Sequence, residues 1–240
     1  MSDDEPRNPS TRRGFIFGAI IVGALALAVI VIAVTALWGG RSNTASPTPH
    51  VTATQPTIAA KEKSICGLPG YDKTATLTVA PATTWTIIGT MAAPSAKNAG
   101  PAITTSEGLR ICYAHTVKGA LFTVANWWAM GSDSRLAQLE VAALIAPGLG
   151  RNAAIAAQTS QSSTGIGAQI TGFKILSYTS DTATVDMAFQ LTDGRLLSFA
   201  YPVIWIEGDW KIVVDNAGQP TFRPVFLQSL GGYTVWKGVS

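Results

Sequence analysis

Cysteine, histidine and charged residues are scarce in this chain. Its 240 residues include two cysteines, two histidines and 13% charged residues. So few potential ligands cannot complete a convincing zinc site, and we expect no metal and no cofactor. The net charge of +3 is small, and no lysine- and arginine-rich cluster lies outside the N-terminal region. We therefore expect no nucleic-acid partner.

One long apolar run stands out against this composition. Residues 14–37 (GFIFGAIIVGALALAVIVIAVTAL) contain no charge, and about 20 helical residues suffice to cross the hydrocarbon core of a bilayer. Three arginines precede the run and only Arg41 follows it closely, which predicts a cytoplasmic N-terminus. We expect a single-pass plasma-membrane protein with a transmembrane helix at residues 14–38 and an extracellular C-terminal domain.

A cleaved secretory signal is the alternative interpretation of the same run. Residues 34–36 (VTA) could serve as a small-residue cleavage site. However, the apolar core of a signal peptide typically spans only about 7 to 15 residues, so the length favours a retained anchor. Both hypotheses place the following domain outside the membrane.

Composition divides the chain into five parts. We expect a cytoplasmic tail at residues 1–13, followed by the transmembrane helix at 14–38. Residues 39–63 are rich in Thr, Pro and Ser and predict a disordered linker. Residues 64–111 predict a loop-rich segment with short strands, and residues 112–240 predict an α+β domain with a C-terminal tail.

The two cysteines both fall in the part of the chain expected outside the membrane. In an oxidising compartment an isolated pair, here Cys66 and Cys112, most simply forms one disulfide. That bond would attach the loop-rich segment to the domain. Two free thiols are the alternative.

Short-range patterns inside residues 64–111 are mixed. Alternation predicts strands at residues 76–79 and 84–88, separated by Pro81. Residues 92–106 are punctuated by Gly and Pro and predict a loop.

The pattern becomes regular in the C-terminal domain. The predicted elements are helices at 116–130, at 132–145 with Ser132 or Asp133 as its cap, and at 151–158, then antiparallel strands at 170–179, 182–192, 195–206 and 210–215. Hairpin turns join the four strands consecutively. A meander with one apolar face must be covered, and the helices are the available cover, which predicts an α+β fold.

Two segments are similar to a known fold family. Residues 113–120 (YAHTVKGA) lead into the first helix, and residues 205–212 (WIEGDWKI) form the last hairpin. Over residues 112–216 the chain resembles the nuclear-transport-factor-2-like (cystatin-like) α+β fold. That resemblance implies helices packed on a curved four-stranded meander, forming a cone.

The complete arrangement resembles a second group of proteins. A tail, one membrane span, a linker and an outer domain of this fold look like the bitopic scaffold subunits of type IV secretion and conjugation channels, and like actinobacterial relatives encoded with conjugative elements. This likeness is architectural, so it carries no functional residue to this chain.

Enzymes of the resembled fold commonly place an Asp, His or Tyr inside the cone. The candidates here would be Asp186, Tyr201, Asp215 and His115. Alternation places Asp186 with threonines on the face opposite the apolar one, so we expect it to be solvated. We expect Tyr201 in the core or at its rim, His115 as a capping or surface residue, and Asp215 in a turn. We therefore predict no catalytic residue.

Aromatic residues offer a different kind of site. Trp127, Tyr201 and Trp205 are candidate pocket-lining residues, although the helical spacing around Trp127 and Trp128 favours core packing. The chain has no nucleophile elbow and no phosphate-binding loop after a strand.

These observations favour a protein that is not an enzyme. We expect a membrane-anchored extracytoplasmic interaction or scaffold protein, which acts as a component or accessory of a conjugation or secretion-type envelope assembly. Its partners would be the bilayer and other proteins, or a second copy of itself. The alternative is an exported small-ligand-binding domain or an enzyme that uses the cone pocket.

Overall fold

The computed structural model describes residues 63–158 and 167–238. The predicted tail and transmembrane helix, and all but the last residue of the predicted linker, lie outside the described residues. Within the described ranges, no helix combines the length and the apolar character that a membrane crossing requires.

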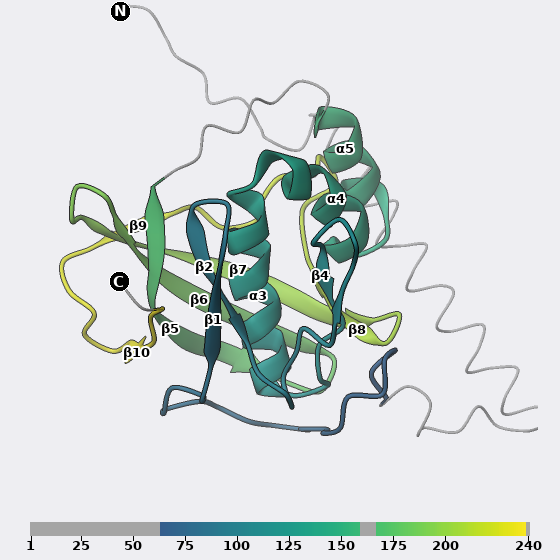
Figure 1. The fold of residues 1–240 in the computed structure, drawn as a ribbon, viewed down its shortest axis with the longest axis horizontal. Helices are drawn as coiled ribbons and strands as arrows, with labels where there is room; N and C mark the ends of the chain where they lie inside the picture. Colours follow the sequence, from purple (N-terminus) through teal and green to yellow (C-terminus); the bar gives the residue numbers. More distant parts are fainter. Residues whose placement is uncertain (1–62, 159–166, 239–240) are drawn as a thin grey trace, which may run out of the picture. The chain divides into compact units, whose positions relative to one another are not determined.

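The described residues combine helices with antiparallel sheets (Figure 1). The largest sheet has six strands in the order β10-β5-β6-β7-β8, with β9 beside β7. Its strands are β5 (Ala168–Tyr178), β6 (Thr182–Leu191), β7 (Leu196–Ile206), β8 (Asp209–Ile212), β9 (Val225–Leu227) and β10 (Thr234–Val235). The predicted meander is present as β5 to β8. The sheet exceeds the four predicted strands because the segment expected to be a tail pairs with both β7 and β5.

Strand β6 shows why the meander has one dry face. Val185 and Met187 are buried, whereas Asp186 between them lies on the other side of the sheet. Opposite them on β7, Tyr201 and Phe199 are also buried. The alternation read from the sequence therefore matches the observed faces.

Three helices follow the expected order. They are α3 (Val117–Gly131), α4 (Ser134–Leu144) and α5 (Leu149–Ala157). The Thr116 hydroxyl accepts the Gly119 amide at the start of α3. Asp133 caps α4 by accepting the amides of Arg135 and Leu136, so the cap is Asp133 rather than Ser132.

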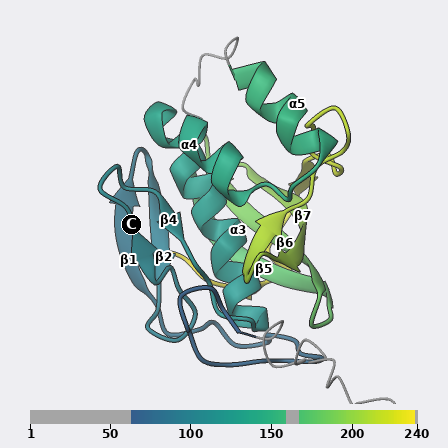
Figure 2. The ribbon, with the colours of Figure 1, turned by 90° about the vertical axis from the view of Figure 1, so that its right-hand side faces the viewer.

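Helix α3 lies between two sheets. Eleven of its 15 residues are buried, which is more than the single apolar face predicted from spacing. Figure 2 shows the reason: a hairpin of β1 (Thr84–Ile88) and β2 (Met91–Ser95) covers the side of α3 that faces away from the large sheet. A helix covered on both sides is buried around most of its circumference.

The prediction of a loop at residues 92–106 was wrong for residues 92–95 and 103–104, while the rest of the range forms no strand. This range contains most of β2 and all of β3 (Ile103–Thr104), which pairs with β4 (Arg110–Ile111). Ala92 and Ala93 are buried in β2, and such small residues give no alternating or β-branched signal.

The strand predicted at residues 76–79 is also absent from this described part of the chain. These residues form no strand pairing there, and Val79 is 75% exposed. Local alternation alone does not make a strand when no neighbouring strand supplies hydrogen bonds.

Large side chains fill the space between α3 and the large sheet. The largest fully buried side chains include Trp210, Tyr113, Phe122, Phe173 and Phe189. All five belong to one contiguous apolar cluster.

Candidate functional site

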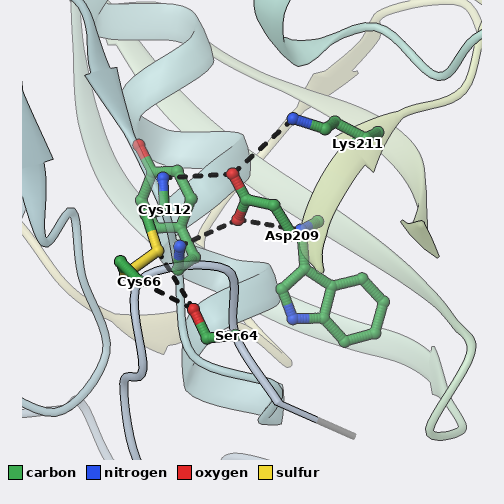
Figure 3. The surroundings of a disulfide bond; sticks show 7 residues. Ser64, Cys66, Cys112, Asp209 and Lys211 are labelled. Carbon is green, nitrogen blue, oxygen red and sulfur yellow. Dashed lines mark hydrogen bonds and ion pairs between the residues drawn. A yellow bond between two sulfur atoms is a disulfide. The ribbon is translucent and has the colours of Figure 1, made fainter. Parts of the chain in front are cut away.

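Cys66 and Cys112 form the predicted disulfide (Figure 3). Cys112 is fully buried, and Cys66 is half-buried. The Ser64 hydroxyl lies 3.0 Å from the Cys112 sulfur and 3.4 Å from the Cys66 sulfur. The bond therefore attaches the segment that precedes β1 to the residues that lead into α3.

The carboxylate of Asp209 lies beside this disulfide. Its Oδ2 accepts the Cys112 amide at 3.0 Å, and its Oδ1 accepts the amides of Tyr113 at 2.8 Å and Trp210 at 3.0 Å. Figure 3 shows Asp209 between Cys112 and Lys211, whose Nζ lies 3.7 Å from Oδ2. Burial raises the pKa of Asp209, while Lys211 and the three amides oppose that rise.

The hairpin motif at residues 205–212 thus has a structural explanation. The Trp210 ring N–H donates to the Ala114 carbonyl at 3.0 Å, and Lys211 Nζ donates to the Ala143 carbonyl at 2.8 Å. These bonds attach the β7–β8 hairpin to the start of α3 and the end of α4. The motif holds elements together and does not form an open site.

His115 and Trp205 are buried against each other. Their rings stack at 3.8 Å with an interplanar angle of 5°, and His115 Nε2 lies 2.5 Å from the Ser180 carbonyl oxygen. His115 is only 2% exposed, so the expectation of a capping or surface residue was wrong; Thr116 provides the cap. Trp205 packs in this group, away from Trp127 and Tyr201.

Asp186 is partly covered by the C-terminal segment. The Tyr233 hydroxyl, next to β10, donates to Asp186 Oδ2 at 2.5 Å. Asp186 Oδ1 is buried and has no hydrogen-bond partner within the described residues. The face was predicted correctly, but the expected solvation was wrong because a distant segment covers it. Burial and this hydrogen bond raise the pKa of Tyr233.

Two of the four catalytic candidates, His115 and Asp186, lie outside the lining of the cleft described below. His115 stacks on Trp205, Asp186 pairs with Tyr233, and Asp215 accepts backbone amides in an exposed turn. Tyr201 lies on the inner face of β7, 5% exposed. Across residues 63–158 and 167–238, no group of His, Cys, Asp or Glu could hold a metal ion.

Trp127 and Tyr201 are brought together in a cleft. The cleft measures about 190 Å³ and lies between α4, α5 and the turn that follows β8. Its lining residues are Trp127, Val141, Ile145, Ala154, Ala157, Gln158, Tyr201, Val214, Gly218, Gln219 and Pro220. Burial raises the pKa of Tyr201 to about 12, and a hydrogen bond from Trp127 opposes the rise.

Sequence reasoning missed Glu140, a buried acid on α4. It is 3% exposed, and its Oε2 has no hydrogen-bond partner in the described part of the chain. Burial holds the pKa of Glu140 well above its usual range. Its spacing of four residues from both Leu136 and Leu144 was the available signal, since all three share the core face of α4.

Sequence reasoning also missed an apolar surface in the presumed tail. Residues 221–226 (TFRPVF), here called the exposed segment, are all exposed and end in β9. Phe222, Val225 and Phe226 are 45%, 57% and 62% exposed. The Arg195 guanidinium lies 5.2 Å from the centre of the Phe226 ring. Aromatic and β-branched side chains gathered on one accessible segment are typical of a protein-binding surface.

Comparison with known proteins places the chain in a family. A family model described as "Domain of unknown function (DUF8175)" matches residues 44–235. Searches of curated proteins and of solved structures each found no match. Since the matched range covers most of its length, the chain belongs to the DUF8175 family.

Proposed function

We propose that this chain is a non-enzymatic, membrane-anchored extracytoplasmic protein that binds other proteins. The exposed segment is the observation that carries this proposal. It presents Phe222, Val225 and Phe226 to solvent at the margin of the large sheet. Strands at a sheet margin with accessible apolar side chains are suited to pairing with another chain.

The location in the proposal rests on the apolar run at residues 14–37 and its basic N-terminal flank. The bonded pair Cys66 and Cys112 supports it, because disulfides persist in oxidising compartments.

We propose a nuclear-transport-factor-2-like cone for the domain. The support is the consecutive meander β5 to β8 with helices on its apolar face. Fully buried side chains such as Trp210 and Phe122 fill the space inside, which leaves little room for a substrate there. Neither His115 nor Asp186 lies in the cleft that Tyr201 lines, which also favours a binding role.

The proposed role is that of a component or accessory of a conjugation or secretion-type envelope assembly. The architectural likeness to bitopic channel scaffolds motivates this part of the proposal. Partner proteins or a second copy of the chain would contact the exposed segment.

Site-specific photocrosslinking in cells that make the full chain tests the proposal. A photoreactive amino acid at Phe226 should give crosslinks to envelope or channel proteins, whereas one at Ile87, which is 66% exposed on β1, should not. Equal yields from both positions would contradict the binding surface. Crosslinks at Phe226 to the chain itself alone would support self-association and contradict the conjugation role.

Fractionation tests the anchor separately. The full-length chain should stay in washed membranes, and protease added to intact protoplasts should digest the domain. Release of a shortened, soluble chain would contradict the anchor and favour cleavage.

A further inference from the structure

The cleft beside α5 has no part in the proposed function. It measures about 190 Å³, and it receives Trp127 from α3 and Tyr201 from β7. Figure 2 shows α5 beside the segment that follows β8. The cleft therefore lies between elements distant in the chain, at a margin of the fold where a small molecule can reach it.

One wall of the cleft is a turn whose shape is fixed by Asp215. The Asp215 Oδ1 accepts the Ala217 amide at 2.9 Å and the Gln219 amide at 2.8 Å. The Asp215 amide in turn donates to the Gln219 carbonyl at 2.9 Å. A wall held by three hydrogen bonds exists before any ligand arrives, which lowers the entropic cost of binding.

The opposite wall, α5, packs closely against this turn. A Cβ on Gly218, whose φ is +77°, would lie 2.5 Å from the Ala154 nitrogen, so only glycine permits this approach. At the other end of α5, Gln158 Nε2 donates to the Ala137 carbonyl at 2.8 Å. Both walls are therefore fixed, and the cleft between them is preformed.

The side chains that line the cleft disfavour a charged ligand. None of the eleven lining residues carries a charge, and moving an ion from water into such surroundings without a partner is costly. The pKa of Tyr201, raised to about 12, keeps its hydroxyl protonated at neutral pH. A phenol hydroxyl can donate its proton, so Tyr201, which lines the cleft, can offer that proton to an acceptor on a ligand.

We propose that this cleft binds one uncharged, ring-sized molecule that carries an acceptor oxygen. The ring contacts Trp127, and the oxygen accepts the hydroxyl proton of Tyr201. A dry protein cavity of about 150 Å³ accommodates benzene, so the slightly larger volume here suits a ring with one substituent. The lining ends at Pro220, directly before the exposed segment begins at Thr221, and the two share no residue, so either proposal can fail alone.

The test uses the full-length chain in lipid nanodiscs and ¹⁹F NMR of three probes, with empty nanodiscs as the reference. The probes are 4-fluorophenol, 4-fluorotoluene, which lacks the oxygen, and 4-fluorobenzoate, which is charged. We expect saturable broadening for 4-fluorophenol, weaker binding of 4-fluorotoluene and none of 4-fluorobenzoate.

Three variants locate the binding. Ala157→Phe fills the cleft and should abolish binding of 4-fluorophenol. Asn152 is exposed on the same helix but outside the lining, so Asn152→Leu should leave binding unchanged. Tyr201→Phe should weaken 4-fluorophenol about three- to tenfold and remove its advantage over 4-fluorotoluene. That loss of preference distinguishes a direct hydrogen bond from a packing role.

Several results would overturn the proposal. They are no saturable binding to the wild-type chain, equal binding of 4-fluorobenzoate, or unchanged binding after Ala157→Phe. If Ala157→Phe does not fold, retention of the 4-fluorophenol preference in Tyr201→Phe would overturn it equally well.

Discussion

Asp209 Oδ2 accepts the backbone amide of Cys112 at 3.0 Å, although 97 residues separate the two in the chain. One carboxylate thereby holds the disulfide-bearing residue, the start of α3 and the β7–β8 hairpin in a single arrangement. The backbone of Cys112 has a φ of 68°, a conformation that non-glycine residues rarely adopt. Asp209 satisfies the amide that this conformation turns into the interior.

Removing the Asp209 carboxylate should strongly destabilise the domain. In Asp209→Ala the buried Lys211 ammonium loses its counter-charge, and three amides lose their acceptor. Breaking a buried pair in this way typically costs about 3 to 5 kcal/mol of unfolding free energy. Urea unfolding of the full chain in detergent, followed by tryptophan fluorescence, measures it. Asp193→Ala, which removes an exposed ion pair with Arg195, should change little.

The disulfide should make stability depend on reductant. Its partners are 46 residues apart, and closing a loop of that size stabilises by about 4 kcal/mol in the chain-entropy model. A reducing agent should therefore lower the unfolding midpoint of the wild-type chain. The Cys66→Ser/Cys112→Ser double variant should unfold at that lower midpoint with or without reductant. An unchanged midpoint on complete reduction of the wild type would contradict the expectation.

Glu140 should make stability fall as the pH rises. Because burial raises its pKa in the folded chain above the ordinary value of 4.5, the folded state holds the proton more tightly than the unfolded state. Protonated Glu140 therefore stabilises the folded state fully below the pKa of Glu140 in the unfolded chain. This stabilisation is lost as the pH rises through the pKa of Glu140 in the folded chain. Glu140→Gln should flatten this decline in urea unfolding measured from pH 4 upwards.

Glu107→Gln is the matched control for that experiment. Glu107 is exposed, and hydrogen bonds, first from Thr105, lower its pKa. The Glu107 carboxylate therefore stabilises the folded state above the pKa of Glu107 in the unfolded chain, and this stabilisation is lost as the pH falls. Glu107→Gln should thus change the free energy of unfolding only at acid pH. If the free energy of unfolding changed with pH in the same way in the wild type and in Glu140→Gln, this would contradict the assignment of Glu140 as a neutral buried acid.

Trp236 should anchor the C-terminal segment to the core. It is 4% exposed, contacts the rings of Trp85, Phe122 and Phe173, and donates to the Thr83 hydroxyl at 2.9 Å. Trp236→Ala should cost about 3 to 5 kcal/mol of unfolding free energy. Its neighbour Val235 is 56% exposed, so Val235→Ala should cost under about 1 kcal/mol. Similar losses from both substitutions would show that Trp236 has no special role.

Local patterns predicted the elements whose signals are complete within a few residues. The order of three helices and four meander strands, a cap at Ser132 or Asp133 and the cysteine pair were all predicted from spacing and residue type, and the structure selects Asp133 as the cap. Strand β2 could not be predicted from local patterns, because Ala92 and Ala93 pack in the core through their small size and show no alternation.

The site residues show the same division. Tyr201 was placed on the inner face from strand phase alone. Its proximity to Trp127 in one cleft depends on how α3 crosses the sheet, whereas Trp205, four residues further along β7, stacks on His115 instead. Asp186 was placed on the correct face, but its covering by Tyr233 involves a residue 47 positions away.

The sequence by itself determined the apolar run, the meander and the helices, because hydrophobic periodicity and capping act over one or two turns or one hairpin. Only the tertiary structure decided which polar groups meet. Contacts between distant segments pair Asp209 with Cys112 and Asp186 with Tyr233. They also bury Glu140, whose Oε2 has no hydrogen-bond partner among the residues that the structure describes. Burial of polar groups requires partners wherever the chain brings them, and that place is set by the packing of the entire domain.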